Sequence, residues 1–268
     1  MRAAVLPIVT FGLFAMVVAD RLSHALATRP DVAVADSTGS SAQGLHSTRP
    51  GDRAVDGRNS AGAMPSTTPT IDRLTRLAIR QQISREAGRT YLDSLMISTD
   101  SVVRRWADRR GVPLKVSLIE GGPAGYSPRM AQSFADALYR WENTGIGVRF
   151  DEVSDTNEAD IVVRWIDHFD IDRAGQTDLT WDQAGRVRKA VISLALRTNG
   201  GYSLPDEALL SVAVHETGHA LGLPHSADSN DVMYPATRTG VLSERDRRTA
   251  QVLYQLQPGP LRDSPVNP

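Results

Sequence analysis

The chain has 268 residues, a formal net charge of −1 and 41 % hydrophobic residues, which suits one or two ordinary globular domains. A charge this close to zero gives no support for a nucleic-acid partner, and none is expected. Because the chain contains no cysteine, it can form neither a disulfide framework nor a thiolate metal site.

A mostly apolar run covers residues 3–19, directly after Arg2. It is near the lower limit for a membrane span and slightly longer than the apolar part of a usual signal peptide. Residues 17–19 and 25–27 both resemble signal cleavage sites. Residues 1–27 are therefore interpreted as a cleaved signal peptide or an uncleaved membrane anchor, with a buried core helix as the remaining alternative. In the first two cases the rest of the chain is exported: secreted, periplasmic or membrane-anchored.

Residues 28–70 are rich in Ser, Thr, Gly, Ala, Pro and Asp and have almost no large apolar side chains. Such a segment cannot bury enough surface to offset the entropy of ordering, so a disordered linker is predicted. Residues 71–107 then carry apolar side chains at three- and four-residue spacing, which predicts a helical segment with a break at residues 98–100. Packing of this segment against the next domain is favoured over a role as a prosegment or stalk.

Residues 108–257 are predicted to form one domain, followed by a flexible tail at residues 258–268. Ser127 and Pro128 are typical of the start of a helix, and apolar residues at helical spacing continue it to Trp141. Ser243 and Asp246 form a capping-box pattern at the start of a last helix. Strands are expected at residues 114–118, 148–150, 161–165, 177–181 and 187–196, with a hairpin turn at 182–185 and a further helix at 205–221.

Residues 215–225 spell H-E-x-x-H-x-x-G-x-x-H. His215 and His219 are four residues apart, so on a helix they share one face and can bind one Zn²⁺ as neutral imidazoles. Glu216 lies about 100° round the helix, too far to be a ligand but able to reach a water at the metal. Gly222 permits the turn that ends the helix, so His225 can return as a third ligand. Three protein ligands leave the fourth position open, as in catalytic zinc sites.

The alternative to a metal site is a solvated helix that carries two histidines and an acid. The residues before and between the histidines are largely apolar, which predicts a buried helix where histidines without a ligand would be costly. Met233, in the sequence Asp-Val-Met-Tyr-Pro, follows at a spacing that suits an apolar floor beneath the histidines.

At these residues the chain resembles the metzincins, whose signature is this histidine motif followed by a Met-turn. His225, Met233, Tyr234 and Pro235 are most similar to the matrixins, and the resemblance covers about residues 112–257. It implies an α+β fold: a twisted mixed five-stranded sheet with an active-site helix, a backing helix and a C-terminal helix. It also implies a zinc endopeptidase in which Glu216 acts as the general base on a water at the zinc.

The resemblance further implies that a protein or peptide substrate binds in an extended form to an exposed sheet edge. Tyr234 and Pro235 would wall the pocket for the residue after the cleaved bond. The edge residues expected to bind substrate are Gln176, Thr177, Asp178, Leu179, Thr180 and Trp181.

One catalytic Zn²⁺ is expected, because His168 is the only histidine in the stretch where matrixins bind a second zinc. Asp167, Asp170 and Asp172 offer oxygen atoms to Ca²⁺, but a solvated acidic loop is the preferred interpretation. A monomer is expected. The rival function is a non-catalytic, metal-stabilised surface binding domain, against which the intact Glu216 argues.

Overall fold

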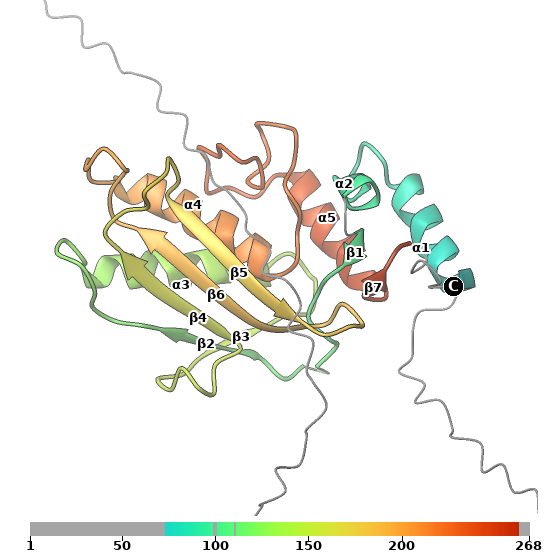
Figure 1. Ribbon diagram of the computed structural model, residues 1–268, viewed down its shortest axis with the longest axis horizontal. Helices are drawn as coiled ribbons and strands as arrows, with labels where there is room; N and C mark the ends of the chain where they lie inside the picture. Colours follow the sequence, from blue (N-terminus) through green and yellow to red (C-terminus); the bar gives the residue numbers. More distant parts are fainter. Residues whose placement is uncertain (1–72, 99–100, 110, 263–268) are drawn as a thin grey trace, which may run out of the picture.

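The computed structural model describes residues 73–98, 101–109 and 111–262 (Figure 1). The expected signal or anchor run and the linker lie outside the described residues. No helix within the described ranges is long and apolar enough to cross a membrane. The helices are α1 (Arg73–Arg85), α2 (Asp93–Ile97), α3 (Pro128–Glu142), α4 (Asp206–Ala220) and α5 (Glu244–Gln255). The strands are β1 (Val102–Val103), β2 (Leu114–Leu118), β3 (Phe150–Glu152), β4 (Ile161–Ile166), β5 (Gly175–Trp181), β6 (Val187–Ala195) and β7 (Gly259–Pro260).

The main sheet has five strands in the order β3-β2-β4-β6-β5. β3, β2, β4 and β6 are parallel, whereas β5 runs antiparallel to β6 and forms the outer strand on that side. The prediction of an α+β fold with a mixed five-stranded sheet is therefore confirmed. β3 begins at Phe150, so the strand expected at residues 148–150 was placed two residues too early.

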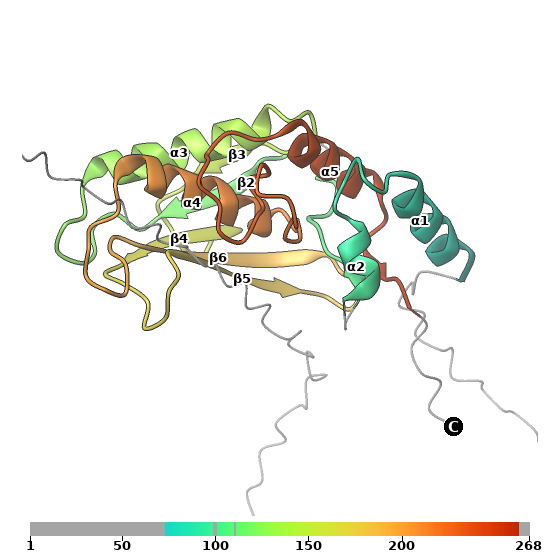
Figure 2. The same ribbon diagram turned by 90° about the horizontal axis from the view of Figure 1, so that it is seen from above.

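Helices α3 and α4 cover one face of this sheet (Figure 2). The apolar stripe of α3 is buried at Phe134, Ala137 and Trp141. Trp141 also donates from its indole Nε1 to the carbonyl oxygen of Val214 in α4, at 2.8 Å. Burial of each large apolar side chain contributes about 1.5–3 kcal/mol, so the stripe fixes α3 against α4.

Helix α4 is buried on all sides, from Leu209 to Ala220 with Leu210 as the one half-buried member. A helix enclosed in this way carries apolar and small residues around its whole circumference. Polar side chains on it are consequently removed from water and need partners within the protein. α5 begins as predicted, with Ser243 and Asp246 forming a complete capping box.

The segment before the sheet is helical only in part. α1 and α2 lie within the predicted helical range, but the helix is interrupted at residues 86–92, where no break was predicted. Residues 102–103 pair with residues 260–259 as strand β1, so the helix predicted up to residue 107 was also wrong there. The reason is a partner more than 150 residues away in the sequence, which helical periodicity does not reveal. The same pairing places the first residues of the predicted tail in a strand, and Leu261 is buried.

Candidate metal centre

The three motif histidines converge on one point. His219 Nε2 lies 3.0 Å from His215 Nε2 and 3.1 Å from His225 Nε2. Among the described residues, they form the group of potential ligands whose donor atoms lie close enough together to hold one ion. His215 and His219 are buried, and His225 is half-buried.

Backbone carbonyls fix the orientation of the two helical imidazoles. His215 Nδ1 lies 2.7 Å from the carbonyl oxygen of Val232, and His219 Nδ1 lies 2.9 Å from that of Leu223. Because a carbonyl oxygen can only accept, each Nδ1 must carry the hydrogen, and each Nε2 presents a lone pair. Such outer contacts orient metal-binding histidines and raise their basicity as ligands.

The turn after α4 brings His225 to this point. Gly222 has a φ of +98°, which a side chain would disfavour, and a Cβ there would overlap the backbone of Arg104. Its N–H donates to His219 O at 2.8 Å, and the N–H of Leu223 donates to Gly218 O at 3.0 Å. These two bonds make a Schellman motif, which reverses the chain directly after the helix.

Burial keeps the histidines neutral. Desolvation lowers the pKa of His215 well below its usual value, and the neighbouring His219 and His225 lower it further. Desolvation also lowers the pKa of His219 to about 4. Neutral imidazole is the form that binds a metal, so the site is ready to accept one at neutral pH.

The donor set fits zinc. The lone pairs of His215 Nε2 and His219 Nε2 face each other at 3.0 Å and repel unless a cation lies between them, and His225 Nε2 lies 3.1 Å from His219 Nε2. Three nitrogen ligands around a tetrahedral zinc, each about 2.0–2.1 Å from it, lie roughly 3.3 Å apart, close to the distances found. With three protein ligands such a site keeps a position open for water or substrate.

Met233 packs against Gly218 of α4, which precedes His219 in the sequence. It is completely buried, and a Cβ on Gly218 of α4 would overlap its sulfur. The turn that carries it is tied to the third ligand, because the N–H of Ser226 donates to Met233 O at 2.9 Å. The assignment of Met233 to a Met-turn stays a prediction, and this contact is compatible with it.

Glu216 lies next to the ligands and is completely buried. The hydroxyl of Thr177 in β5 is 2.6 Å from Glu216 Oε2 and 3.0 Å from the Glu216 carbonyl oxygen. Thr177 was predicted only as part of a substrate edge. Its contact with Glu216 depends on how β5 packs against α4, which no local pattern reveals.

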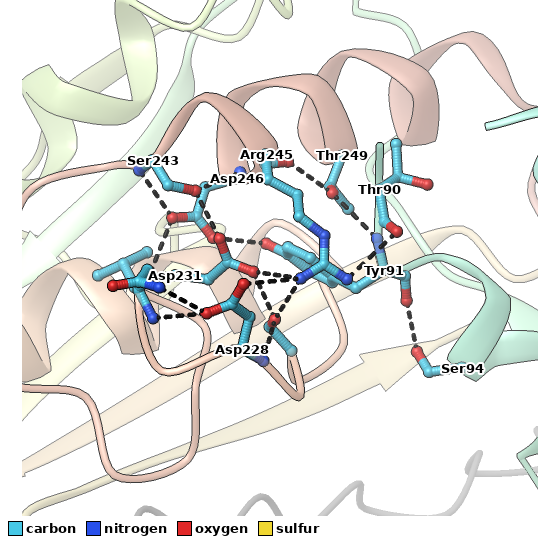
Figure 3. Close-up of polar contacts among 12 residues, drawn as sticks. Thr90, Tyr91, Ser94, Asp228, Asp231, Ser243, Arg245, Asp246 and Thr249 are labelled. Carbon is cyan, nitrogen blue, oxygen red and sulfur yellow. Dashed lines mark hydrogen bonds and ion pairs between the residues drawn. The ribbon is translucent and has the colours of Figure 1, made fainter. Parts of the chain in front are cut away.

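Two buried aspartates, Asp231 and Asp246, form a network of hydrogen bonds beside Met233 in the sequence (Figure 3). Asp246 accepts from the N–H of Val232 at 2.8 Å and from the hydroxyl of Tyr91 at 2.9 Å. Asp231 accepts from Arg245 at 2.8 Å and from the hydroxyl of Ser243 at 2.7 Å. The carbonyl oxygen of Val232 also accepts a hydrogen bond from His215. Asp246 therefore supports this candidate ligand indirectly, by fixing the backbone of Val232. The sequence identified Asp246 only as a helix cap.

Burial raises the pKa of Asp246, while the hydrogen bonds from Val232, Ser243 and Tyr91 lower it in part. These donors thus stabilise the ionised form of the buried carboxyl group, and the carboxyl group in turn supplies their acceptor. A buried polar group of this kind is costly to leave without partners.

The remaining predicted residues lie as follows. Along β5, Gly175, Thr177 and Leu179 are buried, whereas Gln176 and Asp178 alternate with them and bond to each other. Thr180 and Trp181 are half-buried at the end of the strand, and Tyr234 and Pro235 are half-buried after Met233. Asp167 pairs with His168 and Arg197, and Asp170 and Asp172 are exposed, which fits a solvated acidic loop.

A family model described as matrixin matches residues 106–255. The chain is 36 % identical over 95 residues to metalloendoproteinase 1 of Glycine max, covering 34 % of this chain and 26 % of the relative. It is 47 % identical over 66 residues to macrophage metalloelastase of Oryctolagus cuniculus, covering 21 % and 14 %. It is 31 % identical over 145 residues to stromelysin-1 of Rattus norvegicus, covering 48 % and 28 %. The matched part of the chain thus spans less than a third of the length of each of these relatives.

Proposed function

Because a family model matches more than half of its residues, the chain belongs to the matrixin family, and from this premise we propose that it is a zinc-dependent endopeptidase. Its substrates are extended polypeptides, which it hydrolyses outside the cytoplasm. The observation that carries the proposal is the convergence of three imidazole nitrogens beside the buried side chain of Glu216.

His215, His219 and His225 hold the metal in this proposal, and Glu216 handles the proton. Zinc, when bound, polarises the scissile carbonyl group and lowers the pKa of a water to about 7. Glu216 takes a proton from the attacking water and passes it to the leaving amine. Both steps need a carboxylate that keeps one orientation.

Thr177 supplies that orientation. Its hydroxyl contacts Glu216 Oε2 at 2.6 Å, so one carboxylate oxygen is held by β5 while the group stays on α4 beside the histidines. A carboxylate that lies ready in this way loses little conformational freedom in the transition state.

The outer edge of β5 binds the substrate backbone. An extended peptide that pairs with an exposed edge strand gains backbone hydrogen bonds whatever its sequence, which suits an enzyme that acts on polypeptides. Leu179 and Thr177 place this edge directly beside the metal centre.

Tyr234 and Pro235 wall the pocket for the residue after the cleaved bond. The loop that follows them is tied to α3, because Arg140 donates to the carbonyl oxygen of Gly240 at 2.7 Å. This anchor gives the pocket a fixed outer wall.

Export is proposed from the apolar run at residues 3–19 and the polar stretch at residues 28–70. A flexible linker of about 40 residues has an end-to-end distance of roughly 35 Å. A domain tethered by such a linker reaches substrates close to the membrane.

Removal and return of the metal test the proposal. The purified chain should hydrolyse casein or gelatin, lose this activity in excess chelator and recover it with added zinc. Metal content is measured in parallel. A zinc-loaded, folded protein that cleaves neither substrate would favour the rival function of a metal-stabilised binding domain.

A further inference from the structure

A cavity of about 180 Å³ lies beside the metal centre, where α4 ends. His219 and His225 form part of its wall, and Leu179 of β5 lines it from the edge strand. Leu179 lies two residues beyond Thr177, which contacts Glu216. The cavity is therefore adjacent both to the ligands and to the strand on which we place the substrate.

The opposite wall comes from the segment before the sheet. Ser94 and Leu95 in α2 and Val102 in β1 line the cavity from that side. These residues precede residue 106, where the match to the family model begins. This wall is thus a feature of the present chain that the family match does not include.

Long-range contacts hold this wall in place. The indole of Trp106 donates to the carbonyl oxygen of Ala220 at 2.8 Å, and Val103 pairs with Gly259. Arg104 stacks its guanidinium 4.1 Å above the ring of Trp181, the last residue of β5. Leu95 is buried. A wall fixed at several points gives the cavity a defined shape.

The lining favours an apolar group. Leu95, Val102, Leu179, Leu223 and Pro224 contribute hydrocarbon, and none of the lining residues that the structure describes is a carboxylate. Arg104 is the charged residue in the lining, and its guanidinium is stacked on Trp181. The volume is close to that of an apolar cavity of about 150 Å³ that takes up benzene. A leucine or phenylalanine side chain is of this size.

The direction of β5 decides which substrate residue enters. Antiparallel pairing is the more stable arrangement and the commoner one, so a bound peptide runs opposite to β5. β5 passes Thr177, beside Glu216, before it reaches Leu179 at the cavity. A peptide in the opposite direction consequently passes the cavity before it reaches the metal centre.

We propose that this cavity, formed by α2, β1, Leu179 and the end of α4, is a subsite for a large apolar side chain that precedes the scissile bond. The inference rests on the proposed peptidase function and adds a substrate preference to it. Among the residues before the cleaved bond, one position prefers leucine or phenylalanine over alanine. Ser94 and Val102 line the cavity, so the volume of their side chains determines which apolar side chain fits into it.

Two substitutions change the cavity in opposite directions. Ser94→Phe fills it, and Val102→Ala enlarges it. Ser133→Phe is the matched control, because Ser133 is also a half-buried helical serine whose hydroxyl donates to a backbone carbonyl three or four residues earlier in the chain. Circular dichroism checks that each full-length, zinc-loaded protein is folded.

Peptides that differ only at single positions before the cleaved bond are the probes. The wild type should cleave the leucine peptide about 10-fold or more faster than the alanine peptide at one of these positions, as kcat/KM. Ser94→Phe should reduce this ratio to less than about 3-fold, whereas Ser133→Phe should keep it. Val102→Ala should shift the preference from leucine toward phenylalanine.

Binding separates this inference from the peptidase function. The same peptides are titrated calorimetrically into the Glu216→Ala protein, with and without Ser94→Phe. If the wild type cleaves no peptide but binding still prefers leucine and loses this preference with Ser94→Phe, the subsite stands and the peptidase function fails. The inference is wrong if peptides are cleaved without a preference before the scissile bond, or if neither cavity variant changes that preference.

Discussion

Two regions of this molecule contribute to the candidate metal centre in different ways. Helix α4 and its turn place the three candidate ligands within eleven residues of sequence, through helical spacing and one glycine. The segment of residues 73–106 borders the same centre through partners far along the chain, such as Tyr91 with Asp246 and Trp106 with Ala220. The candidate ligands are thus set by residues close together in sequence, whereas the contacts that support them and one wall of the adjacent cavity depend on residues brought together by the fold.

The largest effect is expected from the local region. Glu216→Ala should lower kcat/KM by about 10²–10⁴-fold, because it removes the general base, while the zinc content stays at one ion per chain. Peptide hydrolysis and metal analysis of the same sample measure both. Near-normal hydrolysis by a zinc-loaded variant would refute the assigned role, and loss of zinc would show that Glu216 supports the ligands instead.

Asp246 lies where the two regions meet. Asp246→Ala leaves the N–H of Val232 and the hydroxyl of Tyr91 without their acceptor and should lower the free energy of unfolding by about 3–5 kcal/mol. Zinc affinity should fall as well, since Val232 orients His215. Urea unfolding and zinc titration provide the test. Asp136→Ala, at an exposed position on α3, is the control and should change stability by less than about 0.5 kcal/mol.

The pH dependence of the metal-free protein tests the local region alone. In the folded chain the pKa of His219 is about 4, below its usual 6.5. The unfolded chain therefore takes up a proton first as the pH falls, and stability decreases from pH 6.5 toward pH 4, with about 2 kcal/mol lost by pH 5. His215 acts in the same direction.

Urea unfolding in excess chelator at pH 7.5 and pH 5 measures this loss. His219→Gln should remove a large part of it, whereas His168→Gln, at an exposed position, should not. Equal stability of the chelated wild type at both pH values would contradict the buried, neutral state of the ligands.

Tyr91→Phe tests the non-local region with the smallest change. It removes the hydroxyl that donates to Asp246 and keeps the buried ring. A hydrogen bond to a charged partner contributes about 1.5–3 kcal/mol, and the low end is expected because Asp246 keeps its backbone donors. The urea midpoint should fall while the slope stays constant. An unchanged urea midpoint would mean that the hydrogen bond from Tyr91 to Asp246 does not contribute to the free energy of unfolding.

Much of the fold of residues 106–255, which the family model matches, follows from patterns that are local in sequence. The capping box at Ser243, the hairpin turn at residues 182–185 and the glycine after α4 each act through neighbours only a few residues away. Strand β1 was missed because two valines acquire a strand conformation only from Gly259 and Pro260. The three histidines could be found from the sequence because their spacing is a local pattern. The contacts of Thr177 and Asp246 were missed because their partners lie far away in the sequence.

The junction between Tyr91 and Asp246 has a consequence for synthesis. The two residues are 155 positions apart, and chains grow at about 5–20 residues per second. Roughly 8–30 seconds therefore pass between the appearance of the tyrosine and that of its acceptor. The histidine motif is made before α5, yet His215 lacks the full support of Val232 until α5 has been translated and docked. Assembly of the metal centre is thus a late event that waits for nearly the whole chain.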